Sequence, residues 1–265
     1  MSLDKFVVEL SLRSGDFAIP QDLSFFVPYL PYHIREALEI GGEAYVSRTP
    51  EGIVSGAFVY DDFERTGTIY TRSMEVFDYF REQKPYGFLF AEFRAEPVTE
   101  VYDIYAVDFE GLAIDHRFSH EISVAERDDS GEIERFMAAT HPGVNRKWVK
   151  VALKNGDKCV IVRLGGEIAG LGWLSLVNNV GRLHTLYVKP SFRGIGMAED
   201  ILFARLLWLK SMHARSAFSE ISRGNSPSAR IAVKGHMRVA GQVFQYSGEA
   251  GQPSANVRRP SLRGK

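Results

Sequence analysis

The pattern of apolar and polar positions along the 265 residues changes repeatedly between a period of two and a helical period. In the second half, runs rich in β-branched and aromatic residues predict strands at 121–126, 158–164, 167–176, 181–188, 216–222 and 242–246. Apolar residues three and four positions apart predict helices at 131–140, at 146–154, from about 197, and at 225–234. The pattern therefore indicates a mixed α/β (α+β) chain.

The first half has a similar pattern. Strands are predicted at 5–12, 43–47, 53–61, 67–72 and 87–93, and helices at 20–38, 74–84 and 97–109. The last of these helices rests on Pro97, because proline suits the first turn of a helix. The elements follow the same order in both halves, which favours an internal duplication. The alternative is an unrelated α+β domain in the first half.

One stretch, residues 183–210, combines a strand, a glycine loop and a helix. Pro190 ends the strand, Gly194 and Gly196 follow, and the helix begins near Met197. Backbone amides and the helix dipole converge at such a junction, which favours an anion and above all a phosphate. The alternative is a tight turn without a ligand. The helix has an apolar stripe, with Arg205 as its polar exception: Ile201, Leu202, Leu206, Leu209 and Met212.

This junction resembles the acetyl-coenzyme A signature of the GNAT superfamily of N-acetyltransferases, [QR]-x-x-G-x-[GA]. Arg193, Gly196 and Ala198 occupy its three specified positions. The hairpin at 165–170 and the segment at 223–241 are similar to two further segments of the family. The resemblance runs through residues 118–247.

The resemblance implies two tandem GNAT-like domains, each with a mixed, mostly antiparallel sheet flanked by helices. Residues 1–117 are expected to form a degenerate copy, 118–247 the acetyltransferase domain, and 248–265 a flexible basic tail. The corresponding junction of the first half, Arg72 to Glu75, contains no glycine, and Glu75 places negative charge where a phosphate would lie. We therefore expect one coenzyme site per chain.

The resemblance also implies the cosubstrate, acetyl-CoA, which fills an opening between the fourth and fifth strands of the family's sheet. The pantetheine is expected along the fourth strand and the pyrophosphate at the glycine loop, with one asparagine approaching from the far side. The expected cofactor-binding residues are Leu186, Tyr187, Val188, Arg193, Gly194, Ile195, Gly196, Met197, Ala198 and Asn225.

Acetyl transfer to an amine requires a base, and His184 is the candidate because imidazole titrates near neutrality. Arylalkylamine N-acetyltransferases have a histidine at the matching position; the alternative is a histidine hydrogen-bonded within the sheet. Arg182 stands where other members carry a carboxylate base, and Ala232 stands at the position of the usual tyrosine acid. His236, Tyr246 or a first-half residue could replace that acid, or the thiolate leaves unassisted.

The composition limits the classes of partner that the protein is expected to bind. The formal net charge of −1 provides no general attraction for nucleic acid. The single cysteine, Cys159, excludes an internal disulfide, and no apolar run approaches the ~20 residues of a membrane span. No signal peptide is visible, so we expect a cytoplasmic protein. We expect no metal cofactor either, since a single cysteine cannot form a cysteine-based metal cluster. Trp148 and Trp173 are candidates to flank the substrate.

The sequence thus predicts an acetyl-CoA-dependent N-acetyltransferase that acts on a small-molecule amine or a peptide amine. Nucleic acid and membrane are not expected as partners, and a homodimer is possible. The alternative is a catalytically lapsed acyl-CoA-binding or interaction protein of the same fold, which the residues at Arg182 and Ala232 would explain.

Overall fold

The structure is a computed structural model. It describes residues 7–10, 37, 42–52, 54–61, 65–71, 73–83, 86–92, 94–140 and 146–248. The tail from 249 onwards and nearly all of the helical region predicted at 20–38 lie outside the described residues. Within this part of the chain, the helices are all too short or too polar to cross a membrane.

The elements of the first half follow the predicted order up to the fifth strand. They are β1 (Val7–Leu10), β2 (Glu43–Arg48), β3 (Val54–Asp61), β4 (Thr66–Thr71), α2 (Met74–Gln83), β5 (Phe88–Ala91) and β6 (Glu100–Asp108). The helix α2 buries Val76, Phe77 and Phe80, the three apolar residues on one side of its helical repeat. Their burial forms the first-half core together with residues of β3, β4, β5 and β12.

The second half matches its predicted elements closely. They are β7 (Ile122–Val124), η3 (Arg127–Asp129), α3 (Ser130–Thr140), α4 (Arg146–Lys154), β8 (Lys158–Leu164), β9 (Glu167–Val177), β10 (Val180–Val188), η4 (Pro190–Phe192), α5 (Met197–Ser211), β11 (Ser216–Ser222), α6 (Ser226–Lys234) and β12 (Arg238–Ser247). The last strand is longer than the predicted 242–246, because pairing continues past an irregularity between Val239 and Gly241.

The helix predicted at 97–109 is wrong, because residues 100–108 form the strand β6. This segment is rich in valine, isoleucine and tyrosine, which favour strands, and β6 lies between β11 and β12 with both of its edges paired. Pro97 precedes the strand, and a proline fits the entry to a strand as well as the first turn of a helix.

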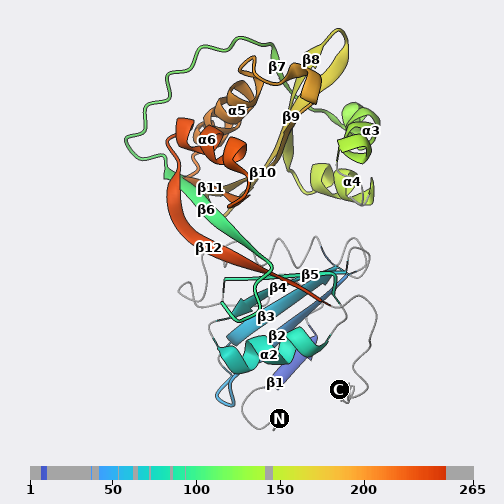
Figure 1. The fold of residues 1–265 in the computed structure, drawn as a ribbon, viewed down its shortest axis with the longest axis vertical. Coiled ribbons are helices and arrows are strands. Elements are labelled where there is room, and N and C mark those ends of the chain that lie inside the picture. Colours follow the sequence, from blue (N-terminus) through green and yellow to red (C-terminus); the bar gives the residue numbers. More distant parts are fainter. Residues whose placement is uncertain are drawn as a thin grey trace.

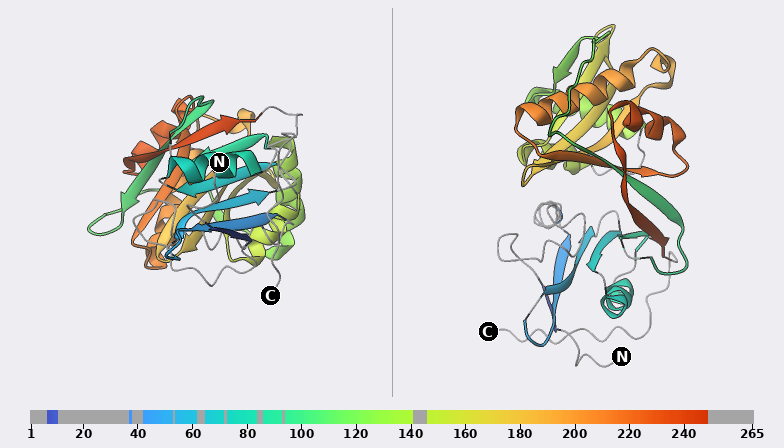
Figure 2. Two further views of the ribbon diagram at one scale, coloured as in Figure 1. Left: turned by 90° about the horizontal axis from the view of Figure 1, so that it is seen from below. Right: turned by 90° about the vertical axis from the view of Figure 1, so that its left-hand side faces the viewer.

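The twelve strands of the described residues form one sheet, in the order β1-β2-β3-β4-β5-β12-β6-β11-β10-β9-β8-β7. The strand β12, from the end of the chain, pairs with β5 of the first half, whereas β6 pairs with β11 of the second half. In Figure 1 and in the right-hand view of Figure 2, β6 and β12 run side by side between the two parts of the molecule. Each half therefore completes the sheet of the other.

Helices cover both faces of the second-half strands. The helix α5 packs on one face through Ile201, Leu202, Leu206 and Leu209, and α3 and α4 pack on the opposite face (Figure 1). Met212, expected at the end of the buried stripe of α5, is instead 49% exposed, because it lies just past the last turn. The sheet and α5 together fix the junction between β10 and the helix.

Candidate active site

The strands β10 and β11 separate part of the way along their length. They pair in parallel only from Val180–Arg182 to Ser216–Phe218, whereas β11 continues to pair with β6 as far as Ser222. Beyond Arg182, β10 therefore leaves its neighbour, and a V-shaped opening forms between the two strands. This is the opening that the resemblance implied.

On its other edge, β10 also departs from regular pairing. His184 pairs with Trp173 of β9 and the next pair is Tyr187 with Leu171, so the register shifts between them. Thr185, directly after His184, has φ of 50°, in the left-handed region. The irregularity is a β-bulge at the level where the strands open.

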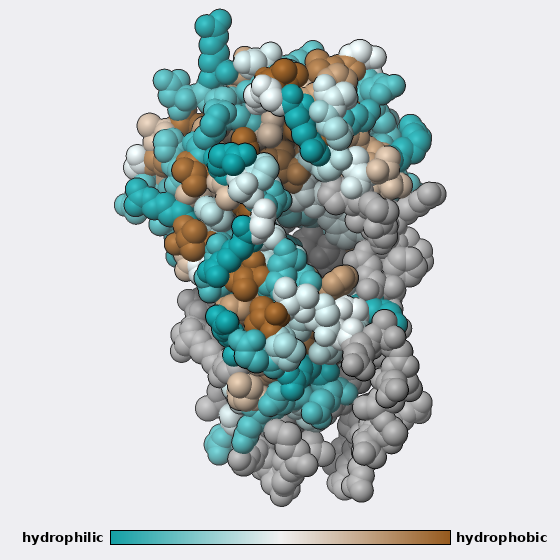
Figure 3. All heavy atoms as spheres, viewed as in Figure 1, coloured by the Kyte–Doolittle hydropathy of each residue, from teal (hydrophilic) through white to brown (hydrophobic). Residues whose placement is uncertain are grey.

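A cavity of about 800 Å³ lies at this opening. Its walls come from both halves of the chain: the β10 segment Arg182 to Leu186, the β11 segment Ser219 to Ser222, residues of α6, and first-half residues that include Tyr70, Phe90, Glu92 and Tyr102. On the visible face of the second half, the surface is mainly hydrophilic with apolar residues in small groups (Figure 3). Because the cavity lies at the strand opening and is lined by both halves, it is the candidate ligand site.

The glycine loop lies between the opening and α5. Gly194 and Gly196 have φ of 85° and 88°, and a Cβ atom at either would meet nothing within 4 Å. Their glycine identity thus follows from backbone conformation, and space is left beside them. The first amides of α5 that donate to a backbone carbonyl are those of Glu199 and Asp200, both to Gly196 O, at 3.0 and 3.1 Å. The amides that precede them can face an anion.

Arg193 ties this loop to the end of β10. Its Nε donates to Val188 O at 3.1 Å, and its guanidinium carbon lies 5.4 Å from the centre of the Tyr187 ring. Ile195 is 51% exposed at the tip of the loop, whereas Met197 is buried against the sheet. The exposed side chain of Arg193 therefore ties the loop to the end of β10.

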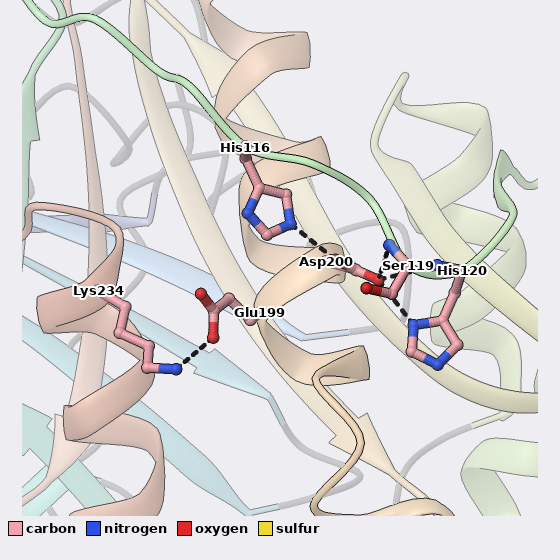
Figure 4. A network of polar contacts seen from close by, with 6 residues as sticks. All are labelled: His116, Ser119, His120, Glu199, Asp200 and Lys234. Atoms are coloured by element: carbon pink, nitrogen blue, oxygen red, sulfur yellow. Dashed lines mark hydrogen bonds and ion pairs between the residues drawn. The ribbon is translucent and has the colours of Figure 1, made fainter.

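The two carboxylates in the first turn of α5 are turned away from the loop (Figure 4). Glu199 pairs with Lys234 of α6. Asp200 accepts hydrogen bonds from His116 Nε2 and His120 Nδ1, both at 2.7 Å, and from the amides of Ser119 and His120, both at 3.1 Å. Burial alone would raise the pKa of Asp200, but these hydrogen bonds offset it and hold the pKa below its usual value.

His184, the predicted base, lies between two indole rings and lines the cavity. Its ring is stacked on Trp173 with centroids 6.4 Å apart, and Trp148 approaches edge-on at 5.7 Å. His184 Nδ1 lies 3.2 Å from the hydroxyl oxygen of Thr185. Trp148 also lines the cavity, whereas Trp173 is fully buried beneath the histidine.

Arg182 forms an ion pair across the opening with Glu220 of β11. Arg182 Nη2 lies 3.0 Å from Glu220 Oε1, and Nε lies 3.3 Å from Oε2. The cavity therefore contains a carboxylate that the sequence did not predict, on β11, the strand next to the one that carries Arg182 and His184. The only available signal was a charged residue inside a strand, since the pairing of the two strands cannot be read from either one.

The position of the family's tyrosine acid, Ala232, and its two candidate substitutes, His236 and Tyr246, lie in three different places. Ala232 is buried between α5 and α6, and His236 is exposed just beyond α6. The hydroxyl of Tyr246 accepts a hydrogen bond from the Ala95 amide at 2.9 Å and belongs to the first-half core. Neither His236 nor Tyr246 belongs to the lining of the cavity among the described residues.

Tyr102 is a first-half residue that the sequence did not single out, and it lines the cavity. Its hydroxyl lies 3.1 Å from Glu100 Oε2 and 3.0 Å from Gln245 Oε1. Burial, together with the charge of Glu100, raises the pKa of Tyr102 to about 12. The phenol is therefore protonated at neutral pH and held in the wall where the exchanged strands meet.

The predicted cofactor residues lie at the end of β10, in the glycine loop, at the start of α5 and at the start of α6. Leu186 lines the opening, the loop follows at the end of β10, and Asn225 caps α6, accepting from the Ser228 amide at 3.2 Å. An opened strand pair beside a glycine loop at a helix N-terminus is suited to a ligand that carries phosphate.

The model of the acetyltransferase (GNAT) family matches residues 99–234, and the chain belongs to this family. The predicted family is confirmed.

Solved structures share the fold. A GCN5-related N-acetyltransferase from Sphaerobacter thermophilus has a TM-score of 0.56 at 13% identity, covering 91% of this chain and 95% of that one. A tandem GNAT protein from the clavulanic acid biosynthesis pathway has a TM-score of 0.60 at 11% identity, covering 94% and 99%. A Drosophila protein reaches 0.64 at 11% identity, covering 87% and 91%. A comparison with curated proteins gave no match.

Proposed function

We propose that the protein is an acetyl-CoA-dependent N-acetyltransferase that transfers the acetyl group to an amine. The observation that carries this proposal is the opening between β10 and β11, which leads directly into the glycine loop of α5. The loop offers backbone amides to a pyrophosphate, and the exposed edge of β10 offers backbone groups to an extended pantetheine chain. Both features belong to the same strand and helix.

The acceptor amine enters from the side of the cavity that the first half forms. Tyr70, Phe90 and Tyr102 lie there, and Trp148 of α4 also lines the cavity, so we infer an acceptor with an apolar or aromatic body. His184 lies in the same cavity and serves as the base that removes the ammonium proton. With alanine at 232, no side chain is assigned as the acid, and the thiolate leaves unassisted.

The first half is proposed as a copy that has lost coenzyme binding. The parallel pairs β4–β5 and β10–β11 occupy equivalent places on either side of the exchanged strands, with α2 and α5 as their connecting helices. At the start of α2, however, the Ser73 hydroxyl accepts from the Val76 amide at 3.4 Å. The start of α2 is thus capped by a side chain, whereas α5 begins at Gly196 without a side-chain cap.

Amine-dependent release of the CoA thiol tests the proposal. The wild-type protein, with acetyl-CoA and a panel of aromatic, aliphatic and peptidyl amines, should release thiol only when an acceptor is present. Binding of acetyl-CoA without thiol release for any amine would favour the lapsed acyl-CoA-binding protein. Absence of binding would overturn both functions.

A further inference from the structure

Arg205 stands on the buried face of α5, where the helical repeat calls for an apolar residue. It is 3% exposed, and no carboxylate among the residues that the structure describes pairs with it. Burial lowers its pKa to about 10, so the guanidinium is still charged at neutral pH. A buried charge without an ionic partner is strongly destabilising unless hydrogen bonds compensate, which indicates a specific role.

Two hydrogen bonds of the Arg205 side chain reach the bulge in β10, and a third, from Nε, goes to Ile201 O of its own helix at 3.4 Å. Its Nη1 donates to Trp173 O at 3.1 Å and to His184 O at 3.3 Å. These two residues form the last regular pair of the β9–β10 ladder before the register shifts. A bulge leaves strand carbonyls without their ladder partners, and the guanidinium supplies donors in their place.

Gly172 gives the guanidinium its room beneath the sheet. A Cβ atom at this position would lie 2.7 Å from Ile201 Cγ2 and 3.0 Å from both Cζ and Nε of Arg205. A larger residue would therefore press on both Ile201 and the guanidinium. The glycine on β9 and the arginine on α5 thus form one arrangement.

The bulge itself is strained. Thr185 has φ of 50°, and a β-branched residue in the left-handed region is strained, so this conformation persists only where the surroundings hold it. Thr185 and Leu186 have no partner residues on β9, and both line the cavity. Besides the contact between His184 Nδ1 and the Thr185 hydroxyl, the hydrogen bond from Arg205 to the His184 carbonyl restrains the backbone directly before the strained residue.

We propose that Arg205 is a positioning residue, which holds the bulge at Thr185 so that the β10 backbone presents its free groups to the acyl donor. This inference rests on the proposed function for its effect on the reaction. The restraint itself is independent of that function, because it concerns the conformation of residues 183–188.

The test compares Arg205→Met with Arg205→Lys. Arg215→Met is the control, because it removes an exposed arginine that lies directly before β11. Acetyl-CoA binding, turnover and hydrogen exchange of residues 183–188 are measured on each folded variant. Arg205→Met should lower kcat about 30- to 100-fold, because small displacements of a reacting group have effects of this size. The Kd for acetyl-CoA should change by less than about threefold, since the glycine loop is intact.

Exchange across 183–188 should become at least about tenfold faster in Arg205→Met, and Arg205→Lys should recover part of both losses. Adding Thr185→Gly to Arg205→Met should restore kcat by about tenfold and restore protection, because glycine adopts positive φ without strain. A general packing role for Arg205 predicts no such rescue. Arg215→Met should match the wild type.

Unchanged kcat and unchanged exchange in folded Arg205→Met would overturn the inference, and so would a failure of Thr185→Gly to restore either quantity. If Arg205→Met does not fold, Arg205→Lys with and without Thr185→Gly provides the same comparison. If the wild type shows no turnover, the proposed function fails, while the exchange measurements still decide the role of Arg205.

Discussion

His184 lies between the rings of Trp148 and Trp173, where β10 leaves its regular ladder. Replacing it with alanine should lower kcat/KM about 10²- to 10⁴-fold, because the acceptor then loses its base. The acid limb of the pH–rate profile should disappear in His184→Ala. His213→Ala, at an exposed position after α5, is the matched control and should leave the profile unchanged. An acid limb that persists in His184→Ala would assign the base elsewhere.

Asp200 links the first turn of α5 to the segment that contains His116 and His120. Its pKa is lower in the folded protein than its ordinary value, so its contribution to stability is present above about pH 4 and is lost as the pH falls through the folded pKa. Asp200→Asn should therefore lower the free energy of unfolding at pH 7 by about 1–3 kcal/mol.

Urea unfolding at pH 7 and pH 3 measures this difference, which should be smaller at pH 3. Glu199→Gln, at the next position, removes only a partly exposed ion pair with Lys234 and should cost less than about 1 kcal/mol. Equal losses for the two variants at pH 7 would contradict a special role for Asp200.

At the residue scale, the sequence predicted the glycine loop because its functional groups are consecutive and their backbone requirements are local. Arg193, Gly194 and Gly196 could be read directly. Glu220 and Tyr102 could not, because each reaches the cavity through the pairing of its strand with a distant one. The roles of His184 and of the other predicted site residues stay predictions.

At the element scale, α5 lies close to the sheet because glycines on β9 and β10 have no side chain in its path. A Cβ atom at Gly181 would lie 2.3 Å from Leu209 Cδ1. Gly181→Ala should therefore lower the free energy of unfolding by about 1–3 kcal/mol through overpacking.

Thermal or urea unfolding checks this expectation. Gly131→Ala is the control, because it lies in α3 with its nearest contact at 3.8 Å, the flexible end of Arg135. It should be neutral or slightly stabilising, since alanine is the better helix former. A neutral Gly181→Ala would show that α5 can move away from the sheet at little cost.

The elements were largely predictable where a periodic run was bounded by turn residues, as in 158–188. The strand β6 was not predicted, because Pro97 favours the first turn of a helix and residues 100–108 were assigned to that helix. The strand pattern of β6 follows from having β11 and β12 as neighbours, and neither neighbour is close in sequence.

At the scale of the whole molecule, the exchange of β6 and β12 couples the two halves. A fragment of residues 118–248 lacks β6, so the edge of β11 that β6 covers would be open and prone to association. A fragment of residues 95–248 retains β6 and should be more stable and more soluble. The intact chain should unfold in a single transition.

Size-exclusion chromatography and thermal unfolding of the two fragments and the intact chain check this. The 118–248 fragment should aggregate or unfold at a lower temperature than the 95–248 fragment. A stable monomer of 118–248, equal to the longer fragment, would mean that the exchanged strands do not bind the halves together.

We expect the loop at Gly194 and Gly196 to hold the coenzyme of an N-acetyltransferase. Isothermal titration with acetyl-CoA tests it most directly, in the wild type, in Gly196→Glu and in Gly156→Glu. Gly156 is matched for its positive φ of 94° and its open surroundings, and it lies at the turn after α4.

The wild type and Gly156→Glu should bind acetyl-CoA with a Kd below about 1 mM, whereas Gly196→Glu should weaken binding by at least about 100-fold, because the carboxylate then faces the pyrophosphate. Absence of binding in the wild type, or equal binding in the two variants, would show that this loop does not hold the coenzyme.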